Sequence, residues 1–93
     1  MATQKTYIVT YDLNQLGQNY DCIREKLGAF GTQWNIQGSV WIIRTDISAI
    51  EIATVLQKCL DGNDTLLVFE LNGENAWVGF DQKGDNWLEA VLV

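Results

Sequence analysis

Residues 39–60, SVWIIRTDISAIEIATVLQKCL, join the clearest strand of the chain to its clearest helix. β-branched and aromatic side chains dominate residues 39–45 and favour a strand. Residues 48–60 predict a helix, because Ser48 and Glu51 form a capping box in which each side chain bonds the backbone N–H of the other residue. Its apolar side chains recur at helical spacing and predict a buried stripe of Ile52, Val55, Leu56, Cys59 and Leu60.

A strand and a helix are predicted on the N-terminal side of this stretch. Residues 5–12 (KTYIVTYD) have apolar side chains on both faces, which is typical of a central strand. After a loop over residues 13–18, residues 19–30 predict a helix that begins at Gln18 or Asn19. The apolar stripe of this helix consists of Tyr20, Ile23, Leu27 and Phe30.

Three further strands and one helix complete the prediction. The strands are bounded by turn signals that contain glycine. The first is residues 32–36, which form a hairpin with residues 39–45. The other two are residues 64–72 and residues 76–80. Asp85 is the predicted N-cap of the last helix, whose apolar face consists of Trp87, Leu88, Val91 and Leu92.

The order of the first six elements, β-α-β-β-α-β, is that of a ferredoxin-like domain. We therefore predict a single α+β domain over residues 1–93, with an additional C-terminal strand and a short helix. Both long helices would cover one sheet face, and we expect Tyr7, Val9 and Tyr11 to need a cover on the other. A second copy in a homodimer is the expected cover, and the C-terminal helix of the same chain is the alternative.

The chain is acidic, with 12 acidic and 6 basic residues and a net charge of −6. A field of this sign repels phosphate backbones, and nucleic-acid binders normally present a basic face, so the charge disfavours nucleic acid as a partner. The acidic side chains of the C-terminal third, Glu70, Glu74, Asp81 and Asp85, are expected to form a solvated surface. The sharper alternatives are a cation site, or a face that mimics phosphate and fits a basic groove of a protein partner.

The chain has two cysteines, Cys22 and Cys59, and no histidine, which excludes a disulfide framework and a thiolate or imidazole zinc site. Both cysteines lie in predicted helices, which favours buried free thiols over a redox pair. The first residues lack the pattern of a secretory signal, and no apolar run is long enough to span a membrane. The expected compartment is therefore the cytoplasm.

Asp12 is the candidate catalytic or metal-binding residue, because it stands at the end of the first predicted strand. A carboxylate at the end of a strand, where a loop opens, is well placed to hold Mg²⁺ or Mn²⁺, and two copies that converge in a dimer would be enough to activate water for phosphodiester cleavage. An Asx turn is the alternative that the residues alone favour. No nucleophile–base pair can be built on Ser39 or Ser48 without histidine. The tryptophans are better explained by packing than by base stacking, because few cations flank them.

The segment Tyr11-Asp12-Leu13, the helix after it and Gln37-Gly38-Ser39-Val40-Trp41 resemble the small CRISPR-associated adaptation nuclease superfamily. The resemblance is closest to its "SinR-like" members, with a distant kinship to virulence-associated protein D, and it covers about residues 5–80 in element order. It implies a ferredoxin-like homodimer that packs through the sheet face. It also implies that Asp12 matches a metal-binding aspartate of the family, and Ser39 a serine at the start of the third strand.

Three functions follow from these observations. The DNA-holding members of that superfamily carry basic residues along the surface, whereas this chain has a net charge of −6. We therefore favour a dimeric, non-catalytic module that binds a protein partner through its acidic surface. The alternatives are a metal-dependent endoribonuclease or endodeoxyribonuclease with paired Asp12 residues, and a toxin–antitoxin component. The sequence does not decide whether the chain is an enzyme.

Overall fold

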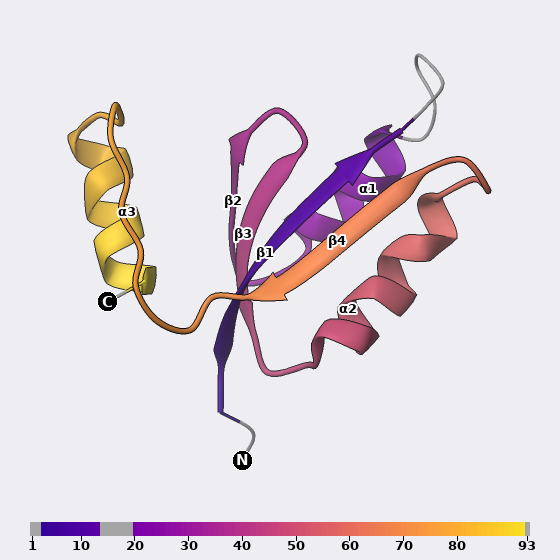
Figure 1. Cartoon of the computed structure of the whole chain (residues 1–93), viewed down its shortest axis with the longest axis horizontal. Helices are drawn as coiled ribbons and strands as arrows, with labels where there is room; N and C mark the ends of the chain where they lie inside the picture. The colour runs from indigo at the N-terminus through magenta and orange to yellow at the C-terminus, as the bar shows by residue number, and fades with distance from the viewer. Residues whose placement is uncertain (1–2, 14–19, 93) are drawn as a thin grey trace.

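The computed structural model describes residues 3–13 and 20–92, and its helices and strands follow one another as Figure 1 shows. They are β1 (Lys5–Asp12), α1 (Tyr20–Gly28), β2 (Thr32–Gln37), β3 (Val40–Thr45), α2 (Ala49–Leu56) with the 3-10 turn η1 (Gln57–Cys59), β4 (Thr65–Glu70) and α3 (Gln82–Leu92). Two predictions lie outside the described residues. They are the loop over residues 13–18, of which only Leu13 is described, and the helix start at Gln18 or Asn19. Within residues 3–13 and 20–92, no helix has both the length and the apolar character needed to cross a membrane.

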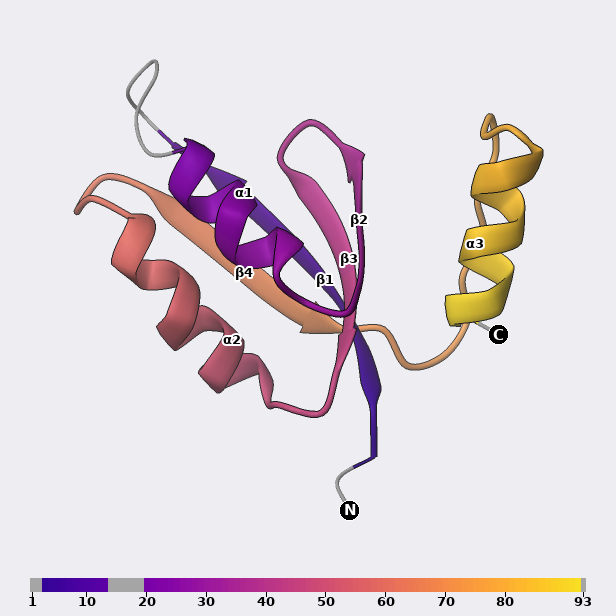
Figure 2. The same ribbon diagram turned by 180° about the vertical axis from the view of Figure 1, so that it is seen from behind.

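The four strands form one antiparallel sheet in the order β2-β3-β1-β4. Val9 of β1 lies opposite Trp41 of β3 on one side and Val68 of β4 on the other, so β1 and β3 are the central strands. α1 and α2 lie together on one face of the sheet (Figure 2). This arrangement confirms the predicted ferredoxin-like α+β architecture.

The hydrophobic core lies between the sheet and these two helices. Strand side chains alternate between the two faces of a sheet. In β1, Tyr7, Val9 and Tyr11 face α1 and α2, and each is at most 4% exposed. The expectation that these three side chains need a cover on the helix-free face is therefore wrong, because they are the side chains that the helices cover. The residues of β1 on the helix-free face are Thr6, Ile8, Thr10 and Asp12.

α2 begins with the predicted capping box. The Ser48 hydroxyl accepts a hydrogen bond from the Glu51 N–H at 3.2 Å, and the Glu51 carboxylate accepts one from the Ser48 N–H at 3.3 Å. Ile52 and Leu56 are then fully buried against the sheet. Val55, which was expected on the same stripe, is 37% exposed, because its position lies at the edge of the stripe.

A disulfide between Cys22 and Cys59 joins α1 to the end of α2. The two Cα atoms are 5.7 Å apart, a separation typical of disulfides. The expectation of two free thiols is therefore wrong. Because α1 and α2 run antiparallel on the sheet (Figure 2), the first turn of α1 meets the end of α2, and this places the two sulfur atoms side by side.

The C-terminal part differs from the prediction at two points. Residues 76–80 form no strand in the described part of the chain, where they pair with none of the strands of the sheet, and Gly79 has a φ of 96°, outside the extended region. The cap of α3 is Asp81 and not Asp85, since Asp81 Oδ1 accepts a hydrogen bond from the Gly84 N–H at 2.8 Å. The Asp85 N–H instead donates to the Asp81 carbonyl at 2.8 Å, which is the first turn of the helix.

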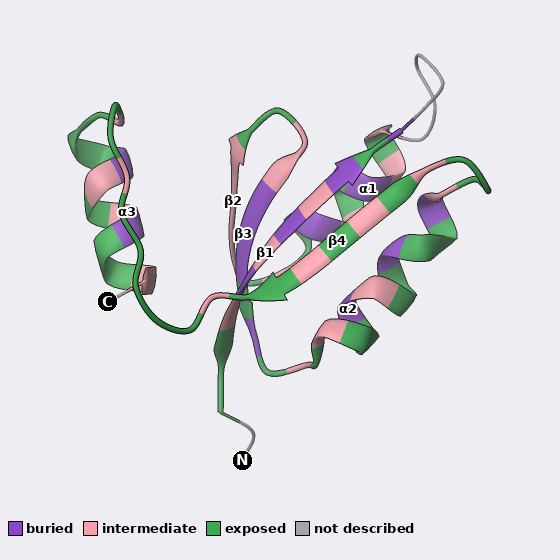
Figure 3. Ribbon diagram, in the orientation of Figure 1, coloured by how far each residue is buried: buried purple, intermediate pink, exposed green. Residues whose placement is uncertain are grey.

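α3 covers only the β2–β3 side of the helix-free face (Figures 1 and 3). Leu88 of α3 and Ile42 of β3 are 1% and 4% exposed. The Thr6 hydroxyl donates a hydrogen bond to the Val91 carbonyl at 3.3 Å, which ties the C-terminal end of the helix to β1. The C-terminal helix therefore folds back as in the alternative expectation, but Leu67 and Phe69 of β4 stay exposed on the helix-free face, beside the half-buried Ile8 and Thr10 of β1. We call this part of the face the open half.

Candidate functional site

The two site residues suggested by the sequence lie at the same end of the sheet. The Tyr11 N–H donates a hydrogen bond to the Ser39 carbonyl at 3.2 Å, so Ser39 is paired with the residue that precedes Asp12. Asp12 is exposed, lies opposite Thr65 of β4 and is on the helix-free face. Ser39 is half-buried. The alternative Asx turn takes its N–H donors from residues 13–16, which lie outside the described residues except for Leu13.

The hairpin turn between β2 and β3 positions Ser39. Gly38 has a φ of 29°, and the Asn35 side-chain amide donates hydrogen bonds to the Gly38 carbonyl at 2.9 Å and to the Val40 carbonyl at 3.0 Å. These bonds close the turn around Ser39 from both sides. The position of Ser39 therefore follows from turn geometry, and this geometry alone does not require a role in chemistry.

Asp12 by itself offers a single carboxylate as a ligand for a cation. In the described residues, no group of three or more His, Cys, Asp or Glu side chains is arranged so that it could hold a metal ion. Mg²⁺ and Mn²⁺ take several oxygen ligands.

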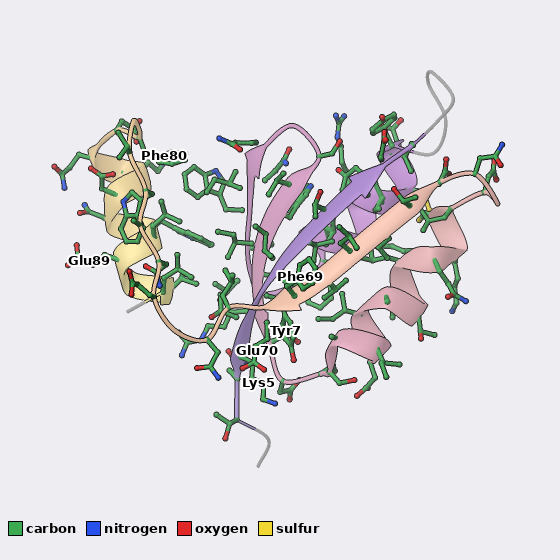
Figure 4. The ribbon with its side chains drawn as sticks, viewed as in Figure 1. Lys5, Tyr7, Phe69, Glu70, Phe80 and Glu89 are labelled. Atoms are coloured by element: carbon green, nitrogen blue, oxygen red, sulfur yellow. A yellow bond between two sulfur atoms is a disulfide. The ribbon has the colours of Figure 1, made fainter. Side chains whose placement is uncertain are left out.

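The open half is apolar at its centre and charged at its two ends. Leu67 and Phe69 of β4 are 54% and 56% exposed, and Phe69 lies opposite Ile8 of β1 (Figure 4). Asp12 is at one end of this face, and Arg44 of the neighbouring strand β3, which pairs with Thr6, borders the other end. An exposed apolar patch with charged ends is typical of a surface that contacts another protein.

The negative charge of the chain is concentrated in its last third. Residues 64–93 contain six acidic residues and one lysine, a net charge of −5, whereas residues 1–63 contain six acidic and five basic residues, a net charge of −1. We call residues 64–93 the acidic third. Its exposed carboxylates are Glu70, Glu74, Asp81 and Glu89. Glu70 ends β4, and Glu89 points away from the sheet on the outer side of α3 (Figure 4).

A hollow of about 400 Å³ lies where α3 meets β2. Sequence reasoning missed it. The predictions assigned the tryptophans to packing, and Trp34 and Trp87 do pack, with ring centroids 5.3 Å apart. No local pattern indicates that residues this far apart in the chain form the wall of a shared hollow. Its lining residues are Gln33, Trp34, Asp81, Lys83, Gly84 and Trp87.

Comparison of the chain with protein-family models, curated proteins and solved structures found no match.

Three surfaces of the described residues are therefore candidates for function. They are the Asp12 end of the sheet, the open half, and the acidic third with the hollow beside α3. The resemblance to the CRISPR-associated adaptation nuclease superfamily stays a prediction.

Proposed function

We propose that this chain is a homodimeric, non-catalytic module whose acidic third binds a basic protein partner. The observation that carries the proposal is the net charge of −5 on residues 64–93, four of whose six carboxylates are exposed. Opposite charge on a partner speeds encounter and selects against acidic competitors and nucleic acids. The exposed apolar side chains of the open half support the dimer.

The partner-binding part of the proposal is tested with a cationic peptide that alternates lysine and glycine. We expect binding that weakens steeply as salt is added, because exposed charges are screened within about 10 Å at 0.1 M ionic strength. Glu74→Lys with Glu89→Lys should weaken binding strongly. Glu25→Lys with Asp46→Lys, which makes the same change of net charge on exposed positions outside the acidic third, should weaken it less. Equal losses in the two double variants would show that only net charge matters.

The dimer is expected to form through the open half. A two-fold contact would bury Leu67 and Phe69 of both copies, and a stable interface needs roughly 800 Å² from each partner. The test is molar mass in solution for Phe69→Asp, with Ile50→Asp as the control, because Ile50 is 79% exposed on α2 on the opposite side of the sheet. We expect Phe69→Asp to be monomeric and Ile50→Asp to remain dimeric. A native protein that is monomeric at micromolar concentration would contradict the proposal.

A metal-dependent nuclease is the second candidate, and the exposure of Asp12 on the helix-free face, at the end of the sheet where Ser39 pairs with Tyr11, favours it. In a dimer through the open half, a two-fold axis parallel to β1 would bring two Asp12 carboxylates to the same end of the interface. An axis across the strands would instead place Asp12 toward Arg44 of the second copy. The test is cleavage of labelled RNA and DNA with Mg²⁺ or Mn²⁺ by the native protein and by Asp12→Asn. Cleavage that is lost in the variant would replace the non-catalytic proposal.

A further inference from the structure

The hollow between α3 and β2 has a rigid aromatic wall. The Trp34 ring meets the Trp87 ring at 66° and the Phe80 ring at 63°, with centroid distances of 5.3 Å and 5.6 Å. These edge-to-face contacts fix the orientation of the indoles. Both tryptophans are only half-buried, so part of each indole remains available to a ligand.

Gly84 lets the two elements come this close. A Cβ atom at Gly84 would lie 3.1 Å from Trp34 Cη2 and 3.1 Å from Phe80 Cβ, closer than ordinary van der Waals contact. The absence of a side chain at this position therefore permits the packing that shapes the hollow. Phe80 lies where the chain enters α3, beside β2 (Figure 4).

Asp81 places a carboxylate at the edge of this aromatic wall. Its Oδ1 accepts a hydrogen bond from the Gly84 N–H at 2.8 Å, which holds the side chain in one position. A carboxylate has about four lone-pair sites, so one hydrogen bond leaves capacity for a ligand. A fixed carboxylate beside an indole is the combination that a guanidinium group uses, since its planar cation stacks on the ring while its N–H groups bond the oxygens.

The charge around the hollow selects between ligands. The acidic third, with its net charge of −5, attracts cations and repels phosphate groups, whereas Lys83 is a single cation on the rim. We infer that the hollow receives an arginine side chain of the basic partner, stacked on the Trp34–Trp87 wall and paired with Asp81. This inference rests on the proposed function, because it names the contact by which the acidic third would recognise its partner.

The experiment compares two peptides of equal length and charge, one alternating arginine with glycine and the other lysine with glycine. An exposed cation–π contact predicts that the native protein binds the arginine peptide about fivefold more tightly. Asp81→Asn should remove this preference while keeping the helix cap, because asparagine is as good an N-cap as aspartate. Glu89→Gln removes the same charge from the outer side of α3, so it should weaken both peptides equally and keep the preference.

Two more variants test the wall and the sign of the ligand charge. Trp87→Leu should lose the arginine preference, and its circular dichroism spectrum shows whether α3 is retained. Lys83→Gln removes the rim cation and should strengthen binding of the arginine peptide, whereas it would weaken binding of a phosphate-bearing ligand.

The possible outcomes separate the inference from the proposed function. Equal binding of the two peptides by the native protein, unchanged in Asp81→Asn, would overturn the arginine site and leave the acidic module intact. No binding of either peptide would overturn both. Weaker binding of the arginine peptide to Lys83→Gln would also overturn the inference, because the rim cation would then assist the ligand.

Discussion

Reduction of the Cys22–Cys59 disulfide should remove a large part of the stability of this domain. The bond joins residues separated by 37 positions. In the chain-entropy treatment, closing a loop of that length lowers the entropy of the unfolded chain by about 13 cal/mol/K, or about 4 kcal/mol at 25 °C. Small domains have a total free energy of unfolding of about 5–15 kcal/mol, so the reduced protein should be marginally stable.

The assay is urea unfolding of the native protein with and without a reducing agent, followed by tryptophan fluorescence. At an m-value of about 2 kcal/mol/M, the loss corresponds to a fall in the midpoint of roughly 2 M. Thiol titration of the unfolded protein should count no thiols before reduction and two after it. Reduction leaves the side chains of the core otherwise unchanged, which matters because Cys59 is 1% exposed and any substitution there also alters packing.

The control is the double variant Cys22→Ala with Cys59→Ala. It should have a low midpoint that the reducing agent does not change. Coincident unfolding curves for oxidised and reduced native protein, with the thiol counts as stated, would refute the loop-entropy argument for this bond. Two free thiols before reduction would refute the bond itself.

Three further substitutions test local features of the fold by the same unfolding assay. Gly84→Ala should lower the free energy of unfolding, because crowding against Trp34 costs about 1–3 kcal/mol and outweighs the gain in helix propensity of at most about 1 kcal/mol. Gly28→Ala is the control, because a Cβ atom at Gly28 meets open space, and it should not lower the free energy of unfolding. Ser48→Ala should cost about 1 kcal/mol through loss of the α2 cap, and a variant of unchanged stability would contradict the role of the capping box. Trp41→Phe should lower the free energy of unfolding by about 1–3 kcal/mol, because it removes the buried indole N–H that donates a hydrogen bond to the Tyr11 hydroxyl at 3.2 Å. An unchanged urea midpoint would mean that this hydrogen bond contributes nothing to stability.

The fold could be predicted from the sequence where local chemistry decides it. The Ser48 and Glu51 box depends on residues three positions apart, and the apolar side chains of residues 5–12 indicate a central strand wherever that strand pairs. The side of the sheet that Tyr7 faces could not be predicted, because a strand with apolar residues on both faces gives no preference. Residues 76–80 have strand-forming side chains, but local propensity does not supply a neighbouring strand, and in the described residues they pair with none.

The candidate site was predicted less well, because its residues meet only through tertiary packing. Asp12 and Ser39 were identified, and their closeness follows from the pairing of β1 with β3. The disulfide depends on the relative position of two helices, which amphipathic spacing does not specify. Asp81 was assigned to a solvated surface and Asp85 to the cap as well, but the two aspartates are four residues apart and fit an N-cap equally well by composition, so the sequence alone does not choose between them.

The uneven charge of the chain has a consequence for the rate at which it meets a partner. With a net charge of −5 on residues 64–93 and −1 on the rest, the charge of the molecule is unevenly distributed, and the part that contains α3 is the more negative one. The field of a cationic partner would turn this part toward it before contact, so that a larger share of collisions begins in a productive orientation. The association rate constant should then fall steeply with ionic strength, while the dissociation rate constant, which depends on short-range contacts, should change much less.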